Sequence, residues 1–284
     1  MNESQDALAR AYPLAEGMHQ RIAVGVAYHG AGFHGWQQQG SPQVATVQGA
    51  LERSLSFVAD HPVRSFCAGR TDAGVHALGQ VAHFDVAVER ANKAWVAGVN
   101  SALPASIRVQ WAHPVDTTFH ARYSATARRY QYWIHNAEVA SALFAGQLTH
   151  VRRPLDAALM HSEAQCLLGE QDFSSFRAAA CESRTAMRNV HSVRVFRCGE
   201  RVCVEIQANA FLLHMVRNIV GALIESGSGR AASGWLAGLL AARDRRIAPA
   251  TASPAGLYLQ HVRYPGRFAL PGADAQLFSI GLGA

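Results

Sequence analysis

The order of its strand-like and helical segments constrains the fold of this chain most strongly. Apolar runs or alternating patterns predict four strands in the first half of the chain, at Arg21–Tyr28, Val63–Ala68, Gln80–Val88 and Ile107–Val115. Apolar residues at helical spacing predict two helices among these strands, one with Thr46 as its N-cap and one at Asn92–Leu103. This order indicates an α+β fold.

The second half repeats this mixture without a recognisable sequence repeat. Its patterns predict a strand at Ala127–Asn136 and a helix at Asp156–Leu168 with Asp156 as its cap. They also predict a hairpin of Asn189–Arg197 with Arg201–Ala208, and two more helices at Phe211–Glu225 and Trp235–Arg243. We therefore expect two α+β half-domains joined near residues 115–125. The expected divisions are a disordered leader at 1–18, half-domains at 19–115 and 116–266, and a tail at 267–284.

The composition is that of a folded protein with an anionic partner. Of the 284 residues, 49% are apolar and 16% are charged, which permits a substantial core and argues against disorder in most of the chain. The formal charge of +6 favours a polyanion such as nucleic acid. Lys93 is the only lysine, and arginine suits phosphate and stacks on bases, although a codon bias toward arginine explains the same enrichment.

Targeting and metal-binding patterns are not found. The five cysteines have no CxxC spacing, so we expect neither a disulfide framework nor a zinc site, and a reducing compartment fits. Residues 1–20 do not resemble a signal peptide. Leu212–Ile224 is the most apolar helical segment, but it contains His214 and Arg217 and is shorter than the roughly 18 residues of a membrane span. These features predict a cytoplasmic protein.

The segment Cys67–Ala77 is the most informative one chemically. It lies between two predicted strands, and Gly69 and Gly74 bracket Arg70, Thr71 and Asp72. A carboxylate near a guanidinium is held ionised and can act as a nucleophile, a base or a metal ligand. By itself a Thr-Asp-Ala-Gly string is more often an ordinary turn.

The full string Gly69-Arg70-Thr71-Asp72-Ala73-Gly74-Val75-His76 resembles the catalytic loop of the TruA family of tRNA pseudouridine synthases. The resemblance extends from about Arg21 to Tyr264. Further matches, in order along the chain, are Tyr28-His29-Gly30, Gly35-Trp36-Gln37, Phe119-His120-Ala121-Arg122, Ala127-Arg128-Arg129-Tyr130, Asp172-Phe173-Ser174-Ser175-Phe176, Ser183-Arg184-Thr185, Asn209 to Asn218 and Gly256-Leu257-Tyr258. The pair Leu212-Leu213 departs from the family pattern, which expects a more polar or aromatic filler before His214.

The resemblance implies a pseudouridine synthase fold, with antiparallel sheets and flanking helices in two half-domains around a basic cleft. It implies that Asp72 is the nucleophile and that Tyr130 stacks on the target base and helps to remove a proton from its carbon 5. It implies no cofactor and no metal. Taken from the residues alone, Tyr130 is more simply a core tyrosine on an amphipathic strand.

Arg217 also has an independent argument, because it interrupts an otherwise apolar helix. A charge on a buried face costs several kcal/mol unless it is paired. The resemblance supplies Asp72 as its partner, and the alternative is an arginine on the solvent face. Thr71 is expected to brace the loop, and His76 and His214 are expected to be structural.

The remaining arginines are candidate phosphate contacts, since phosphate contacts supply much of the affinity for RNA. They are Arg122, Arg128, Arg129, Arg177 and Arg184, although single arginines are often merely solvated. Arg70 is expected to place the RNA backbone or to wedge open the target base pair. The resemblance further implies a homodimer that acts on the anticodon arm of tRNA at uridines 38, 39 and 40. Such a protein reads the shape and backbone of RNA, because A-form RNA hides its base edges.

Two other functions are compatible with parts of the pattern. A catalytically silent RNA-binding or RNA-folding protein would share the scaffold, but it would not require Asp72, Tyr130 and Arg217 together. An aspartate-dependent hydrolase would need clustered metal-binding carboxylates or a second placed carboxylate. Asp85 and Asp116 are isolated in the sequence and do not provide one.

Overall fold

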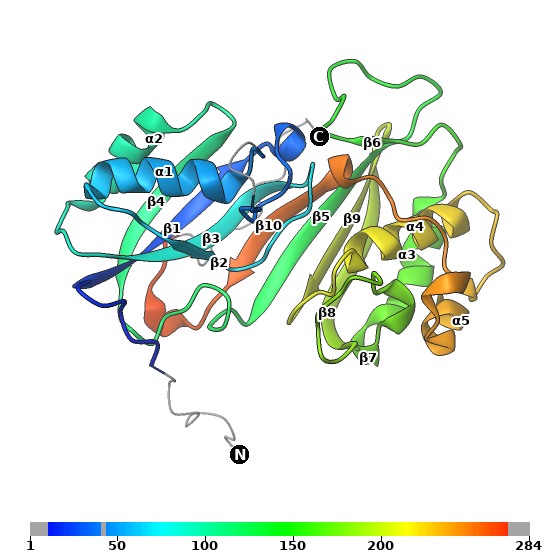
Figure 1. Ribbon diagram of the computed structural model, residues 1–284. Helices are drawn as coiled ribbons and strands as arrows, with labels where there is room; N and C mark the ends of the chain where they lie inside the picture. Colours follow the sequence, from blue (N-terminus) through cyan, green and yellow to red (C-terminus); the bar gives the residue numbers. More distant parts are fainter. Residues whose placement is uncertain (1–10, 41–43, 272–284) are drawn as a thin grey trace. The chain divides into compact units, whose positions relative to one another are not determined.

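The chain forms two compact units, which a computed structural model describes for residues 11–40 and 44–271 (Figure 1). Within these residues, unit 1 comprises 11–40, 44–73, 77–126 and 262–271. Unit 2 comprises 74–76 and 127–261. Residues 1–10 of the predicted leader and 272–284 of the predicted tail lie outside the described residues. The rest of the leader contacts unit 1, where the Tyr12 amide donates to the Thr117 carbonyl at 2.7 Å.

Unit 1 is an antiparallel sheet with helices packed beside it. Its elements are β1 (Gln20–Tyr28), η1 (Gly30–Gly32), α1 (Val47–Ala59), β2 (Ser65–Cys67), β3 (His76–Val86), η2 (Ala94–Gly98), α2 (Val99–Ala102), β4 (Ile107–Val115) and η7 (Gly266–Phe268). β1 pairs with β3 on one side and with β4 on the other, and β2 extends the sheet beyond β3. All of these pairings are antiparallel, as predicted.

The core of unit 1 follows from its apolar periodicity. Leu51 and Leu55 lie one helical turn apart on α1 and are completely buried. The Thr46 hydroxyl accepts a hydrogen bond from the Gly49 amide, which confirms Thr46 as the N-cap. Trp95 of η2 packs edge-to-face on Phe84 of β3, with ring centroids 5.2 Å apart.

Unit 2 contains further paired strands and three α-helices among its described residues. Its elements are β5 (Ala127–His135), β6 (Thr149–His150), α3 (Ala157–Ala164), η3 (Gln165–Leu167), β7 (Gly169–Asp172), η4 (Ser174–Phe176), β8 (Met187–Cys198), β9 (Arg201–Ala208), α4 (Met215–Gly227), α5 (Trp235–Ala242), η5 (Arg245–Ile247), η6 (Pro254–Gly256) and β10 (Leu257–Arg263), the last of which runs into unit 1 at Val262. The strand order is β10-β5-β9-β8-β7, and β6 runs parallel to the end of β5. The predicted hairpin is confirmed as β8 and β9.

The helix α3 packs against β8, and α4 packs against α3 (Figure 1). A Cβ at Gly227 of α4 would come within 2.5 Å of the Met160 side chain of α3, so any larger residue there would force Met160 to move. Every residue of β5 from Tyr130 to His135 is buried, as expected of a central strand.

The predicted helix Phe211–Glu225 begins four residues later than expected, at Met215. His214 has a left-handed backbone with φ of 61°, which no helix interior permits, and it therefore becomes the N-cap. α1 and α4 have 13 residues each. In the described part of the chain, no helix combines the length and apolar character needed to cross a membrane.

Candidate active site

Asp72 lies in the loop that joins β2 to β3. The two strands pair from Ser65 opposite Phe84 to Cys67 opposite Ala82, and the Ala68 amide then donates to the Val81 carbonyl at 2.8 Å. This ladder gives the loop a rigid stem. Asp72 is half-buried, so its carboxylate is accessible without being fully hydrated.

Gln80 ties the first residue of the loop to the sheet. The Gln80 side chain is completely buried, donates to the Gly69 carbonyl at 2.7 Å, and accepts from the Gly69 amide at 3.4 Å. Two hydrogen bonds from one side-chain amide to the N–H and the C=O of Gly69 fix the backbone of this residue in orientation. Our sequence analysis did not identify Gln80, because a single glutamine on a strand carries no signal of this role.

Thr71 holds the centre of the loop, as predicted. Its hydroxyl lies 2.7 Å from the Tyr28 hydroxyl, and its carbonyl accepts from the Trp36 amide at 3.0 Å. Thr71 is 8% exposed and Trp36 is 1% exposed. A buried polar group left without a partner costs about 1–3 kcal/mol, so these contacts oppose any movement of the residue that precedes Asp72.

Gly35 permits the close approach of the neighbouring loop. Its φ is +92°, and a Cβ at this position would lie 2.7 Å from the Thr71 carbonyl oxygen and 3.1 Å from the carbonyl carbon of Asp72. Any other residue would be strained in its backbone and would displace the Asp72 peptide. The Gly35-Trp36 match to the family pattern therefore has a structural reason.

The last residues of the loop, 74–76, are anchored within unit 2. The His76 ring is 1% exposed, and its Nε2 lies 3.0 Å from the Gly146 carbonyl and 3.1 Å from the Ala255 carbonyl. The ring also stacks on Tyr258, with centroids 4.6 Å apart. The prediction that His76 is structural is confirmed.

Tyr130 lies on β5 of unit 2 and is 8% exposed. Its ring meets Phe211 edge-to-face, with centroids 5.1 Å apart and an interplanar angle of 86°. This contact holds the phenol ring in one orientation, which a stacking role requires. It also fits the core-tyrosine interpretation, so the role of Tyr130 stays a prediction.

Arg217 lies in the first turn of α4 and is half-buried rather than on an open solvent face. Its Nε donates to the Ala252 carbonyl at 2.8 Å, and the Ala252 amide donates back to the Arg217 carbonyl at 3.2 Å. The guanidinium is thus fixed by a backbone segment of the same unit. The expected pair with Asp72 would join residues of different units and stays a prediction.

Three of the candidate phosphate-binding arginines are engaged within unit 2. Arg128 donates to the Asn209 carbonyl at 2.8 Å, and Arg129 donates to the Gln207 side chain at 2.9 and 3.1 Å. Arg177 donates to the carbonyls of Cys181 and Ser183, both at 2.7 Å, and so braces a loop. By contrast, Arg70, Arg122 and Arg184 are exposed.

Cys67 is another side chain beside the loop that could act as a nucleophile. Burial raises the pKa of the Cys67 thiol to about 12, although the positive charges of Arg70 and Arg122 oppose this shift. Cys67 is therefore a protonated thiol at neutral pH and a poor nucleophile. Within residues 11–40 and 44–271, no three or more histidine, cysteine, aspartate or glutamate side chains are placed to hold a metal ion.

Comparison with known proteins identifies relatives over most of the chain. A family model described as tRNA pseudouridine synthase matches residues 25–124 and 164–265, which include Asp72 and Arg217 but not Tyr130. Proteins named tRNA pseudouridine synthase A from Pasteurella multocida and a Shewanella species are 55% identical over 251 residues, covering 88% of this chain and 94% and 95% of theirs. The protein of that name from Salmonella paratyphi B is 54% identical, with 88% and 92% covered.

Among solved structures, a chain of a Cbf5-Nop10-Gar1 complex aligns with 86% of this chain and 49% of its own length, at 12% identity and a TM-score of 0.31, which is too low to bear on the fold. The sequence relatives, in contrast, match nearly end to end. A family model that spans both units and relatives that share more than half of their residues leave one conclusion: the chain belongs to the tRNA pseudouridine synthase family.

Proposed function

We propose that this chain isomerises uridine to pseudouridine in the anticodon arm of tRNA, at positions 38, 39 and 40. The observation that carries the proposal is Asp72, a half-buried carboxylate on a loop whose preceding residue is fixed by Tyr28 and Trp36. A nucleophile must be held close to its target, and this loop has little freedom to move. The names of the 54–55% identical relatives supply the reaction and the substrate class.

The reaction exchanges one glycosidic bond for another without any net transfer. The bond from ribose carbon 1′ to nitrogen 1 breaks, the base turns, and carbon 1′ bonds to carbon 5. Nitrogen 1 gains a proton and carbon 5 loses one, so the atoms balance without an oxidant or a group donor. Asp72 is the nucleophile that holds the substrate covalently between these two steps.

Tyr130 and Arg217 are proposed as the partners of Asp72. The Tyr130 ring is held by Phe211 and would stack on the base, which is worth about 1–3 kcal/mol, after the base has been extruded from its helix. Arg217 would pair with the Asp72 carboxylate and favour its ionised form. Its bond to the Ala252 carbonyl would hold the guanidinium in place for that pairing.

The binding surface and the assembly are also proposals. The exposed residues Arg70, Arg122 and Arg184 and the half-buried Arg128 and Arg129 would contact the RNA backbone. A homodimer in the cytoplasm, with one tRNA across both subunits, follows from the family resemblance.

The test is an isomerisation assay on a transcribed tRNA, with chelator present and no cofactor added. The wild-type chain should form pseudouridine at uridines of the anticodon arm, read by site-specific chemical mapping. Asp72→Ala and Asp72→Asn should form none, because neither offers a nucleophile. Asp60→Asn is the matched control, since Asp60 ends α1 in a left-handed conformation that asparagine tolerates.

Two outcomes would contradict the proposal and favour a different function. Binding of several tRNAs without any isomerisation by the wild type would favour a silent RNA-binding protein. Loss of the reaction on chelation would favour a metal-dependent enzyme, in which Asp72 would be a ligand.

A further inference from the structure

Unit 1 carries a surface cluster of aromatic rings and arginines, of which the proposed function uses only Arg122. We call it the aromatic-arginine patch and define it as Arg64, Phe66, His120, Arg122 and Tyr123. Phe66 of β2 is 43% exposed and Tyr123 is 62% exposed. The His120 ring lies between them, with centroids 5.7 Å from Phe66 and 4.4 Å from Tyr123.

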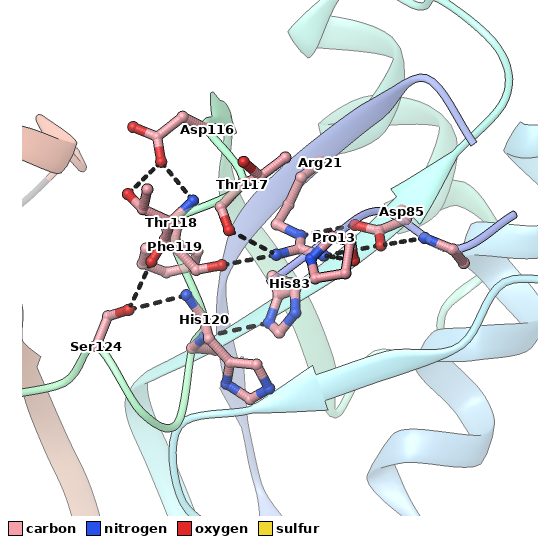
Figure 2. Close-up of polar contacts among 12 residues, drawn as sticks. Pro13, Arg21, His83, Asp85, Asp116, Thr117, Thr118, Phe119, His120 and Ser124 are labelled. Atoms are coloured by element: carbon pink, nitrogen blue, oxygen red, sulfur yellow. Dashed lines mark hydrogen bonds and ion pairs between the residues drawn. The ribbon is translucent and has the colours of Figure 1, made fainter. Parts of the chain in front are cut away.

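The rings of the patch rest on a rigid base. His83 of β3 is 2% exposed and stacks under Phe66, with centroids 5.2 Å apart, and it meets the His120 ring edge-on at 4.6 Å. The Ala121 amide donates to His83 Nδ1 at 3.1 Å. The His120 amide donates to the Ser124 hydroxyl at 2.9 Å, a contact that can be followed in Figure 2. Ring surfaces that are already ordered lose little entropy when a ligand binds.

The two arginines of the patch lie against its exposed rings. The Arg64 guanidinium carbon is 5.5 Å from the Phe66 centroid, and that of Arg122 is 5.6 Å from the Tyr123 centroid. Burial lowers the pKa of His120 to about 4 and that of His83 to about 3, so both rings are neutral at neutral pH. The positive charge of the patch therefore comes from Arg64 and Arg122.

The patch adjoins the stem of the catalytic loop. Phe66 and Cys67 are consecutive residues of β2, and Asp72 follows Phe66 by six positions. Arg122 and Arg70 both lie close enough to Cys67 for their charges to act on its thiol. A polymer held at Asp72 can therefore extend over the patch without leaving unit 1.

We propose that the aromatic-arginine patch binds the RNA substrate, with an unpaired base stacked on Tyr123, the more exposed of the two rings, and neighbouring phosphates held by Arg64 and Arg122. This inference rests on the proposed function for its substrate. Alternating aromatic and guanidinium groups are the pattern used for unpaired nucleotides, because every base offers a ring face and every linkage a negative charge. An apolar protein partner would not require arginines against both exposed rings.

The test compares Tyr123→Ala with Tyr123→Phe, which keeps the ring. Binding of a tRNA transcript is measured by filter retention at fixed salt, and the isomerisation rate is measured in single turnover. Tyr123→Ala should weaken binding about 5- to 100-fold, the effect of losing one stacked base, with its rate at saturating enzyme unchanged. Tyr123→Phe should bind like wild type. Phe57→Ala removes an aromatic ring of unit 1 that is 74% exposed and lies outside the patch, and it should change neither quantity.

The arginines give a second readout that a structural role would not change. Arg64→Ala and Arg122→Ala should each reduce the slope of log affinity against log salt by about 1, because each removes one phosphate contact. Arg90→Ala, at another exposed arginine of unit 1, is the matched control.

The outcomes separate this inference from the proposed function. If Tyr123→Ala isomerises and binds tRNA like wild type, the patch does not contact RNA. If Tyr123→Ala converts a dimer to monomers in sedimentation while tRNA affinity is unchanged, the patch joins copies of this chain, and the inference is overturned. If the wild type isomerises no uridine yet Tyr123→Ala loses RNA binding, the proposed function fails and the RNA-binding patch stands.

Discussion

The buried histidine of unit 1 predicts a specific loss of stability in mild acid. His83 is 2% exposed and lies beside the His120 ring and the Arg21 guanidinium. Burial lowers its pKa from 6.5 to about 3, with smaller contributions from His120 and Arg21, because the protonated ring would lose its hydration and lie near other positive charges. Its Nδ1 already accepts the Ala121 amide and would lose that bond on protonation.

The direction and size of this change in folding stability follow from proton linkage. Between pH 6.5 and about 3 the unfolded chain binds a proton at residue 83 that the folded chain does not, so folding stability falls as the pH falls. At pH 7 the lowered pKa of His83 reduces the folding stability by about 0.2 kcal/mol, and at pH 5 it reduces it by about 2 kcal/mol. We therefore expect His83 to lower the free energy of unfolding by about 2 kcal/mol between pH 7 and pH 5.

The assay is urea unfolding at both pH values, followed by tryptophan fluorescence and far-UV circular dichroism. His83→Gln keeps an acceptor for the Ala121 amide but does not titrate, so its loss of stability between pH 7 and pH 5 should be smaller by about 2 kcal/mol. His120 shifts in the same direction, so some pH dependence should remain in the variant. His34→Gln, at an exposed histidine of unit 1, is the control and should behave like wild type. Equal pH dependence in wild type and His83→Gln would refute the reasoning.

Three further experiments test the ion pair of Arg21, the close approach of Gly35 and the thiol of Cys67. Arg21→Met should cost about 3–5 kcal/mol in urea unfolding, because it leaves the Asp85 carboxylate, whose side chain is only 14% exposed, without the guanidinium that binds it at 2.7 and 2.9 Å (Figure 2), and a loss below 1 kcal/mol would contradict this. Gly35→Ala should abolish most isomerisation while tRNA binding persists, since its Cβ would push on the Asp72 peptide; unchanged turnover would show that the loop can yield. Cys67 should react with iodoacetamide at pH 8 far more slowly in folded than in unfolded protein, as read by mass spectrometry, because burial raises its pKa to about 12.

Local signals made much of the fold predictable from sequence. The start of α1 depends on the Thr46 cap and an apolar stripe, both visible in a few residues, and β4 and β9 have the predicted bounds. β7 was missed because Gly169–Asp172 contains no apolar residue and pairs with β8 through its backbone. The left-handed backbone of His214 was equally invisible, because nothing in the sequence demands it.

The candidate site could likewise be predicted only in part. The Gly69–His76 string identified the loop and Asp72, because the whole chemical signature is contiguous. The support from Gln80 and the aromatic-arginine patch could not be predicted, because they depend on which distant residues the sheet brings together. Phe66 and His120 are 54 positions apart in the sequence, and only the folded chain places their rings in contact.

The return of residues 262–271 to unit 1 has a consequence for biosynthesis. Phe119, completely buried, packs against Tyr264 and Phe268 with centroids 5.1 Å from each, and the Tyr264 hydroxyl donates to the Ala121 carbonyl at 2.6 Å. A ribosome adds about 5–20 residues per second, so on the order of 10–30 s pass between the synthesis of Phe119 and that of these two partners. The nascent unit 1 therefore exposes an apolar surface until nearly all of the chain has been made, and a translation product that stops before residue 262 should be a chaperone or protease substrate even though β1 to β4 are complete.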